Sequence, residues 1–497
     1  MTVASATRAC APALRGPAAG PRGGAALARV AGLRVAAAPR AGRVAVGLAG
    51  AAVVVNLLAS GNLLAAAGIP YAAEGGSIVV KLHPGTYLAV LSVVAMAWRR
   101  PVATAAALAA EARVPLLYLA SLAGCCGFAL AGTGRVHLVV FLENFMPAGL
   151  LALVLGRAGE RALRRLGLVV LAVLVLGVVV SVGETLGQRH LVPIVLAGRE
   201  ELEPAAEFRG AGLYDHPLTG AMLTAAGLFL AGSEGIGRGW RVALAAVFGV
   251  GLVAFGGRTA LVLAAVVFAG WRGAGMLGRL ARRALRRSDL VAAGCAVSVV
   301  PAALALLLTQ TGVGARLVTH LYWDDSARVR NVQWHLLPMM DPGEKLFGMT
   351  LARQEMALHQ LSLTWRIGAV ENFWLLIYLY LGAAGFALFV AGFVAFLGWA
   401  FRRASLPGRL MLGVVMLAAS TSNSLGHKAN LLTVLVPMAL ASAALRRPAA
   451  ASPGVGAVTG AAGGGGRPGG CRMPALRAPV GGLAAAGVGP AGREPGA

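Results

Sequence analysis

Long apolar runs alternate with short polar intervals along most of the chain. Many of these runs approach the ~20 residues that a helix needs to cross the hydrocarbon of a bilayer. They fall near residues 44–64, 87–98, 114–132, 136–156, 167–183, 217–232, 240–255, 259–271, 290–309, 373–400, 410–422 and 429–445. The pattern predicts an all-α integral membrane protein, a polytopic helical bundle of about 12 transmembrane helices. A count of about eleven is the alternative, because Pro101–Ala110 could form a half-helix.

Composition supports the membrane class and argues against nucleic acid as a partner. The chain is 58% hydrophobic and 13% charged, whereas about a quarter of the residues of soluble domains are charged. The net charge of +25 comes from arginines in the two ends and in short connections, without the interleaved aromatic residues that would stack bases. The five cysteines show no metal-ligand spacing, which gives zinc or disulfides little weight.

Charge divides the connections into two alternating sets, and the excess of Lys and Arg marks the cytoplasmic side. If the basic N-terminus is cytoplasmic, the Arg-rich connections lie on its side of the membrane. The opposite intervals hold nearly all acids and histidines: 65–86, 133–135, 184–216, 256–258, 310–372 and 423–428. We therefore predict that both termini are cytoplasmic and that 310–372 is one large outer loop between late helices.

The two ends of the chain carry no periodic apolar face. Residues 1–43 are basic and rich in Ala, Gly and Pro, and residues 446–497 are rich in Gly, Ala and Pro. We predict disordered cytoplasmic tails, with a start codon assigned too early as the alternative for the first. The chain contains no P-loop, which argues against nucleotide hydrolysis.

The outer loop contains the charged sequence DDSARVR, from Asp324 to Arg330. A helix beginning at Asp325 or Ser326 would place Arg328 and Arg330 on different faces, so that one of them meets a ligand. An internal salt bridge within this sequence is the structural alternative. Trp334 and the LFG sequence at 346–348 are expected to pack the loop onto the bundle.

Two further arginines are predicted on the outer face. Arg209 precedes Asp215-His216-Pro217, where Asp215 could simply cap the next helix. Arg258 follows Gly256-Gly257 in a turn that joins two spans. Since a guanidinium fork matches phosphate oxygens, we interpret Arg209 and Arg258 as a diphosphate-binding pair. A snorkelling arginine is the alternative for Arg258.

One carboxylate lies just before an apolar run and another lies within one. Glu371-Asn372 opens the run at 373–400, where Glu371 could either stabilise the helix start or accept a proton at the interface. Glu143-Asn144 falls within a run, and because an acid in a membrane is costly, Glu143 is expected to face the bundle interior in a structural hydrogen bond.

The order of these motifs resembles the O-antigen ligase and Wzy-type polysaccharide polymerase superfamily over residues 44–445. IPYAAEGGSIVVKLHPGTY, ENFWL and TSNSLGHK (421–428) are similar to its VpsF-like exopolysaccharide branch. Ligases of the superfamily carry a His followed by Asn, Ser or Gln, nine residues, Gly, two residues, and a small or aromatic residue. Here Glu371 stands in place of the His, Asn372 matches, and Gly382 and Gly385 have the glycine spacing.

The resemblance implies a GT-C-like membrane glycosyltransferase of the bacterial inner membrane with a periplasmic loop at 310–372. It would transfer a glycan from a polyprenyl diphosphate to a sugar hydroxyl of another lipid-linked repeat, by inversion and without metal or cofactor. Glu371 would be the base, with Asp215 assisting, and Arg209, Arg258, Arg328 and Arg330 would bind diphosphate. The supporting residues are His216, Asp324, Asp325, Asn372 and Lys428. Ligase activity, a lipid-linked sugar flippase or export subunit, and a noncatalytic scaffold among other exopolysaccharide assembly proteins remain alternatives.

Overall fold

The computed structural model describes residues 42–69, 71, 77–133, 136–196, 199–200, 208–282, 325–365, 369–426 and 430–446. By its contacts the chain divides into two units, 1–447 and 448–497, and all described residues belong to the first. The predicted run at 290–309, Asp324 and Lys428 lie outside the described residues, as do the predicted tails apart from residues 42, 43 and 446.

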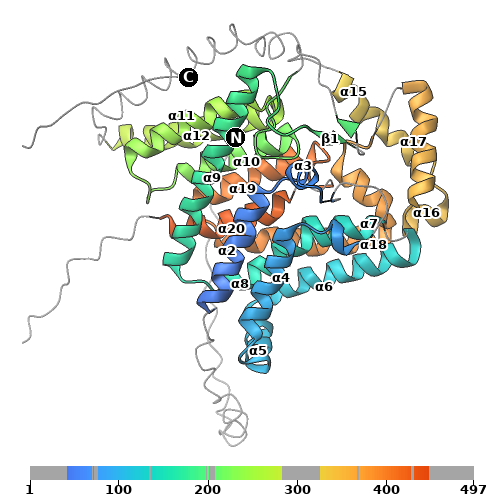
Figure 1. Cartoon of the computed structure of the whole chain (residues 1–497), viewed down its shortest axis with the longest axis horizontal. Coiled ribbons are helices and arrows are strands. Elements are labelled where there is room, and N and C mark those ends of the chain that lie inside the picture. The colour runs from blue at the N-terminus through green and yellow to red at the C-terminus, as the bar shows by residue number, and fades with distance from the viewer. Residues whose placement is uncertain are drawn as a thin grey trace, which may run out of the picture. The chain divides into compact units, whose positions relative to one another are not determined.

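The protein is a helical membrane protein (Figure 1). Its helices follow the predicted apolar runs closely. They are α2 (Arg43–Leu58), α3 (Gly61–Ala66), α4 (Pro84–Ala97), α5 (Pro101–Glu111), α6 (Arg113–Phe128), α7 (Val136–Val140), α8 (Met146–Leu155), α9 (Glu160–Gly187), α10 (Pro217–Ala231), α11 (Arg238–Ala254), α12 (Arg258–Ala281), α15 (Asp325–Val332), α16 (Pro342–Phe347), α17 (Leu351–Trp365), α18 (Phe373–Arg403), α19 (Leu406–Ser420) and α20 (Leu431–Ala444).

Shorter elements join or extend these helices. The described part of the chain contains two 3₁₀ turns, η1 (Val79–Lys81) and η5 (Gln333–Leu336), and two π-helical segments, η2 (Ala129–Thr133) and η3 (Phe141–Phe145). Strands β1 (Val195–Leu196) and β2 (Arg199–Glu200) pair antiparallel.

Within the described residues, five helices are long and apolar enough to cross a membrane. The pair α4 and α5 would make a sixth span, although it is bent by 109°. The bend separates Pro101–Glu111 from α4, as the half-helix alternative predicts. Four shorter apolar helices, α2, α10, α19 and α20, have 14 to 16 residues. At 1.5 Å per residue each is roughly 21–24 Å long, less than the ~30 Å hydrocarbon thickness.

The helices of the bundle share two chemically different ends. At one end, Ser405 N–H donates to Ser442 Oγ (3.1 Å), Gly235 N–H to the Leu445 carbonyl (2.7 Å), and an Arg403 guanidinium N–H to the Gly156 carbonyl (3.3 Å). These bonds join the ends of α8, α10, α18, α19 and α20. Because the connections there carry the arginines, we call it the arginine end.

The opposite end contains Glu184, Asp215 and Glu371, and we call it the polar end. Thr185 at the end of α9 donates to the Ala254 carbonyl at the end of α11 (3.4 Å). Phe373 N–H at the start of α18 donates to the Ser422 carbonyl just beyond α19 (3.2 Å). The assignment of these ends to the two sides of a membrane stays a prediction.

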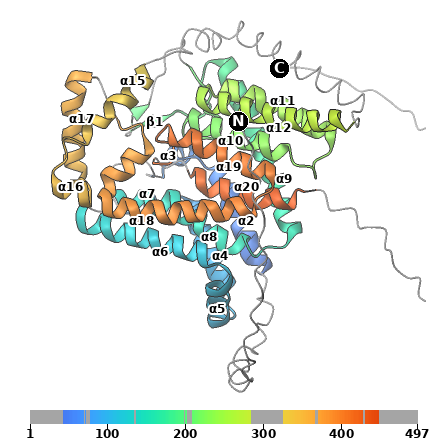
Figure 2. The ribbon, with the colours of Figure 1, turned by 180° about the vertical axis from the view of Figure 1, so that it is seen from behind.

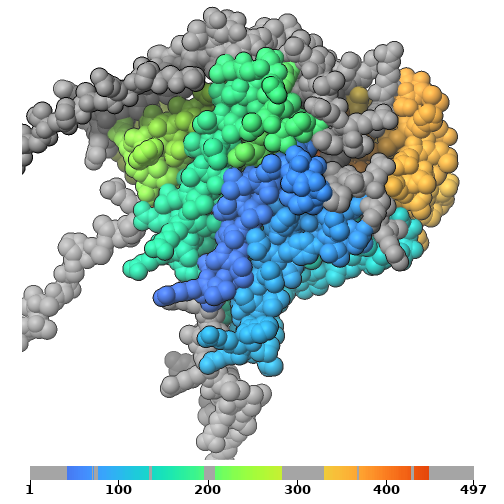
Figure 3. Space-filling view, in the orientation of Figure 1, coloured from blue at the N-terminus to red at the C-terminus, as the bar shows by residue number. Residues whose placement is uncertain are grey.

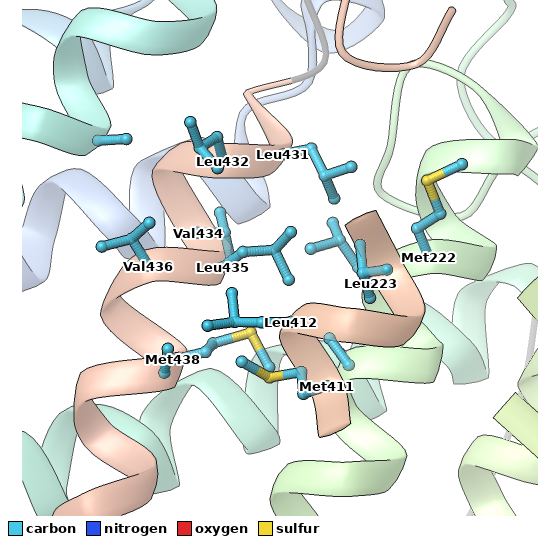
Figure 4. Close-up of a cluster of buried hydrophobic side chains, with 14 of the residues drawn as sticks. Met222, Leu223, Met411, Leu412, Leu431, Leu432, Val434, Leu435, Val436 and Met438 are labelled. Carbon is cyan, nitrogen blue, oxygen red and sulfur yellow. The ribbon is translucent and has the colours of Figure 1, made fainter. Parts of the chain in front are cut away.

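Apolar packing dominates between the ends. Leucine, valine and methionine side chains of α10, α19 and α20 interlock, including Met222, Met411 and Met438 (Figure 4). Helix α6 runs beside α18 (Figure 2), where the Tyr118 and Phe396 rings stack with centroids 4.1 Å apart. On another face α2 and α9 form a continuous surface (Figure 3). Since lipid tails are as apolar as these side chains, close van der Waals packing is what holds such helices together.

Helix α18 is not the single continuous span predicted for 373–400. Gly382 has φ 61° and ψ −175°, which breaks the helix after nine residues, Phe373–Leu381. The Trp374 and Phe386 rings lie 6.4 Å apart, and those of Phe373 and Phe389 6.2 Å apart. In a straight helix residues 373 and 389 would be roughly 24 Å apart, so the first segment must fold back along the second. A positive φ is readily adopted only by glycine.

Candidate functional site

The start of α18 carries an ion pair between the outer loop and the bundle. Arg330 Nε lies 3.4 Å from Glu371 Oε2, and the two side chains are 33% and 35% exposed. Arg330 comes from α15, which contains both Asp325 and Ser326, so neither of these predicted N-caps stands outside the helix. Arg328 and Asp325 lie in the same helix, but their side chains are outside the described residues. Of the two predicted arginines, Arg330 therefore meets the predicted base.

Gln333 holds the main chain next to this ion pair. Its Oε1 accepts hydrogen bonds from Glu371 N–H (2.9 Å) and Asn372 N–H (3.1 Å), and its side chain is fully buried. Gln333 lies one helical turn after Arg330, so both side chains reach Glu371. Gln333 was not predicted, since a lone glutamine in a loop has no recognisable motif.

Asn372 and the segment after α19 complete this part of the site. Asn372 Oδ1 accepts from Leu375 N–H (3.1 Å) and caps the first segment of α18. Asn423 Nδ2 donates to the Val370 carbonyl (3.1 Å). Glu371 is thus fixed on both sides by polar contacts from distant parts of the chain.

Helix α16 packs at the break in α18. Met349 N–H donates to the Leu379 carbonyl (2.7 Å), and a side chain at Gly382 would meet the main chain of Leu346 and Phe347. The LFG sequence packs onto the bundle as predicted, but through its main chain, since Leu346 and Phe347 are 47% and 51% exposed. Trp334 is also about half exposed, and its packing onto the bundle stays a prediction.

Arg209 lies against the glycine turn that precedes Arg258. Its Cγ and Cδ are 3.1 Å from the position that a Cβ would take at Gly256, where φ is 64°. Arg258 is the first residue of α12. Two arginines far apart in sequence are therefore placed beside one turn at the polar end of the bundle, and a side chain at position 256 would require Arg209 to shift slightly.

A buried carboxylate fixes the segment that carries Arg209. Glu184 Oε1 accepts from Leu191 N–H and Oε2 from Gly212 N–H, both at 2.7 Å. His190 Nδ1 lies 3.7 Å from Oε2. Glu184 was not predicted, because only the fold shows that the loop between α9 and α10 contacts it near both ends, through Leu191 and Gly212.

Asp215 does not cap α10, contrary to the structural alternative. The N-cap is His216, whose Nδ1 accepts from Leu218 N–H (3.1 Å). The extended backbone of His216, with φ −149° and ψ 141°, places its ring over the first turn, and Asp215 lies one residue too early. Asp215 Oδ1 instead accepts from Asn62 N–H (3.0 Å), and Asn62 Nδ2 donates to the Asp215 carbonyl (3.1 Å).

Glu143 is fully buried in η3 and hydrogen bonded, as predicted. Its Oε1 accepts from Tyr71 Oη (2.7 Å) and His83 N–H (2.8 Å). Burial, followed by the charges of Glu143 and Asp215, raises the pKa of Tyr71 well above its usual value. The Asn430 side chain also bonds to Tyr71. Tyr71 therefore links a buried acid to the start of α20.

Hydrogen bonds and close contacts connect several of these groups across the polar end. Asn144 Nδ2 donates to the Leu425 carbonyl (3.0 Å). In the sequence Leu425 lies between Asn423, which contacts the residue before Glu371, and Asn430, which bonds to Tyr71. On the other side, a Cβ at Gly61 would lie 2.7 Å from the Tyr71 ring and 3.0 Å from Asp215 Oδ1. These contacts connect the surroundings of Glu371 with those of Tyr71 and Asp215. Comparison with protein-family models and with curated proteins finds no match for this chain.

Proposed function

We propose that the protein is a membrane polysaccharide polymerase of the exopolysaccharide or O-antigen type. It would transfer a glycan from a polyprenyl diphosphate donor to a sugar hydroxyl of another lipid-linked repeat. The observation that carries the proposal is the Arg330–Glu371 ion pair at the start of α18, at the same end of the bundle as Arg209 and Arg258. The polar end would thus combine a carboxylate with several guanidinium groups, and glycan transfer from a diphosphate needs both.

The proposed reaction is a single displacement. The acceptor hydroxyl oxygen attacks the anomeric carbon of the donor sugar while Glu371 takes the hydroxyl proton. The bond from the anomeric carbon to the diphosphate oxygen breaks, polyprenyl diphosphate leaves, and the anomeric configuration inverts. Arg209, Arg258 and Arg330 would neutralise the charge that grows on the diphosphate. Asp215 would orient one of these arginines.

The finer architecture belongs to the same proposal. We place about 12 spans in the bacterial inner membrane in a GT-C-like arrangement, with both termini cytoplasmic and the polar end facing the periplasm. The positive-inside tendency supports this orientation, because the arginine end would then face the cytoplasm. Lipid-linked oligosaccharide, membrane lipids and other exopolysaccharide assembly proteins are the proposed partners.

A flippase for lipid-linked sugars is the second candidate, favoured by the broken helices. Transporters commonly use discontinuous helices and buried ionisable groups. Here α18 breaks at Gly382, α4 and α5 are bent by 109°, and Glu143 is fully buried. A ligase would share the polymerase chemistry and differ only in its acceptor.

Reconstitution separates these functions. Purified protein in liposomes would be supplied with polyprenyl-diphosphate-linked repeat units, and the products would be sized and located. A polymerase lengthens the lipid-linked chains. Transfer to a different added acceptor would indicate a ligase, and movement of unchanged repeats across the bilayer would indicate a flippase.

A further inference from the structure

Glu371 and a donor diphosphate would compete for the same guanidinium group. Arg330 Nε, which is itself buried, lies 3.4 Å from Glu371 Oε2, while the two side chains as a whole are about one third exposed, so that a ligand can approach their exposed parts. A diphosphate carries more negative charge than a carboxylate and accepts bidentate hydrogen bonds from arginine. It is therefore a suitable replacement for Glu371 as the partner of Arg330.

The scaffold around the pair would survive the exchange. Gln333 Oε1 bonds to the main-chain N–H groups of Glu371 and Asn372, at 2.9 and 3.1 Å, and not to the Glu371 carboxylate. Asn372 remains fixed as the cap of α18 through Leu375 N–H. The Glu371 side chain can thus lose Arg330 while its backbone stays in place.

We infer that donor binding transfers Arg330 from Glu371 to the diphosphate and thereby converts Glu371 into the base for the acceptor hydroxyl. This rests on the proposed function and adds an order to it, with the lipid diphosphate binding before the acceptor. In the present structure Glu371 Oε2 faces the guanidinium of Arg330. Transfer of Arg330 to the diphosphate turns this side of the carboxylate toward the acceptor hydroxyl only when a donor is in place.

The test is equilibrium binding of farnesyl diphosphate to the full-length protein in detergent, with no acceptor present. Glu371→Gln removes the competing charge and should tighten binding by about twofold to fivefold, the range expected for a partly exposed ion pair. Arg330→Gln should weaken binding, and adding Glu371→Gln to Arg330→Gln should give no gain.

A matched control exists in the same loop. Glu344 pairs with Arg353 at 3.3 Å with similar exposure, and its side chain also completes the capping box of α16. Glu344→Gln keeps a capping side chain and should leave binding unchanged. Thermal melting of each variant checks folding.

The outcomes separate this inference from the proposed function. Unchanged or weaker binding by the folded Glu371→Gln variant overturns the exchange while leaving a diphosphate-dependent transferase intact. A gain that persists without Arg330 also overturns it. Failure of the folded wild-type protein to bind farnesyl diphosphate contradicts both.

Discussion

Phe373 and Phe393 lie twenty positions apart in α18, yet their ring centroids are only 6.3 Å apart. In a continuous helix the two residues would be separated by roughly 30 Å. The chain therefore reverses at Gly382, and Glu371 enters the bundle beside the middle of the longer helical segment. The reversal brings the proposed base to the level of Ser422 and Asn423, at the polar end of the bundle.

The reversal should depend on glycine at position 382. Replacing Gly382 by Ala combines a positive φ with a collision against the main chain of Leu346 and Phe347. We expect a loss of stability of about 1–3 kcal/mol, seen as a lower melting temperature in detergent. Gly398→Ala, in the same helix with no atom within 4 Å of the new Cβ, is the control and should melt no lower than wild type. Equal melting temperatures of the Gly382→Ala and Gly398→Ala variants would contradict the expected strain at position 382.

Asp215 allows its structural and chemical roles to be separated. Asp215→Asn retains an oxygen that can accept from Asn62 N–H, whereas Asp215→Ala removes it. The Ala variant should lose about 1 kcal/mol of stability, in the range of a lost helix cap. The Asn variant should melt near wild type but transfer glycan more slowly if the charge orients an arginine. Wild-type transfer by a stable Asn variant would assign Asp215 a structural role alone.

Arg258 should contribute to transfer, and Arg238 should not. Both are the first residue of a helix, α12 and α11, but they lie at opposite ends of the bundle. Arg258→Ala removes hydrogen bonds between charged groups, and the loss should be about 1.5–3 kcal/mol, or roughly 10- to 100-fold in transfer rate. Rates would be compared in reconstituted protein. Similar losses in the Arg258→Ala and Arg238→Ala variants would contradict a specific diphosphate role.

The two ends of the bundle should face different compartments. With the five native cysteines replaced, Arg258→Cys and Glu371→Cys should react with a membrane-impermeant maleimide from the same side of the membrane. Arg238→Cys should react from the other side, because it lies at the arginine end. Labelling of positions 258 and 371 from opposite sides would show that Arg258 and Glu371 do not share a site.

Apolar periodicity predicted the helices well because each run must satisfy its own backbone hydrogen bonds in lipid. The predicted runs at 217–232 and 429–445, for example, correspond to α10 and α20. The break in α18 could not be predicted in this way, since Gly382 takes its positive φ only where α16 packs against it. The nine residues between Asn372 and Gly382 in the motif prove to be the helical segment that folds back.

Residues of the candidate site could be predicted where a charged side chain stands among apolar residues or next to glycines. Arg209, Arg258 and Glu371 stand out among apolar residues, and the interior position of Glu143 follows from the cost of an acid in a membrane. Gln333 and Glu184 could not be identified, because their roles arise from main-chain groups brought to them by the fold. The alternative that Asp215 caps α10 was wrong, because the sequence DHP does not show which side chain reaches the first turn.

The central claim is that Glu371 accepts the acceptor proton during transfer from a polyprenyl diphosphate. Its most direct test is chain elongation by purified protein in liposomes, comparing wild type with Glu371→Gln, which keeps the side-chain volume and the main-chain bonds to Gln333. We predict that wild type lengthens lipid-linked repeats and that the variant inserts and folds normally but forms no polymer. Normal polymer from Glu371→Gln would contradict the account.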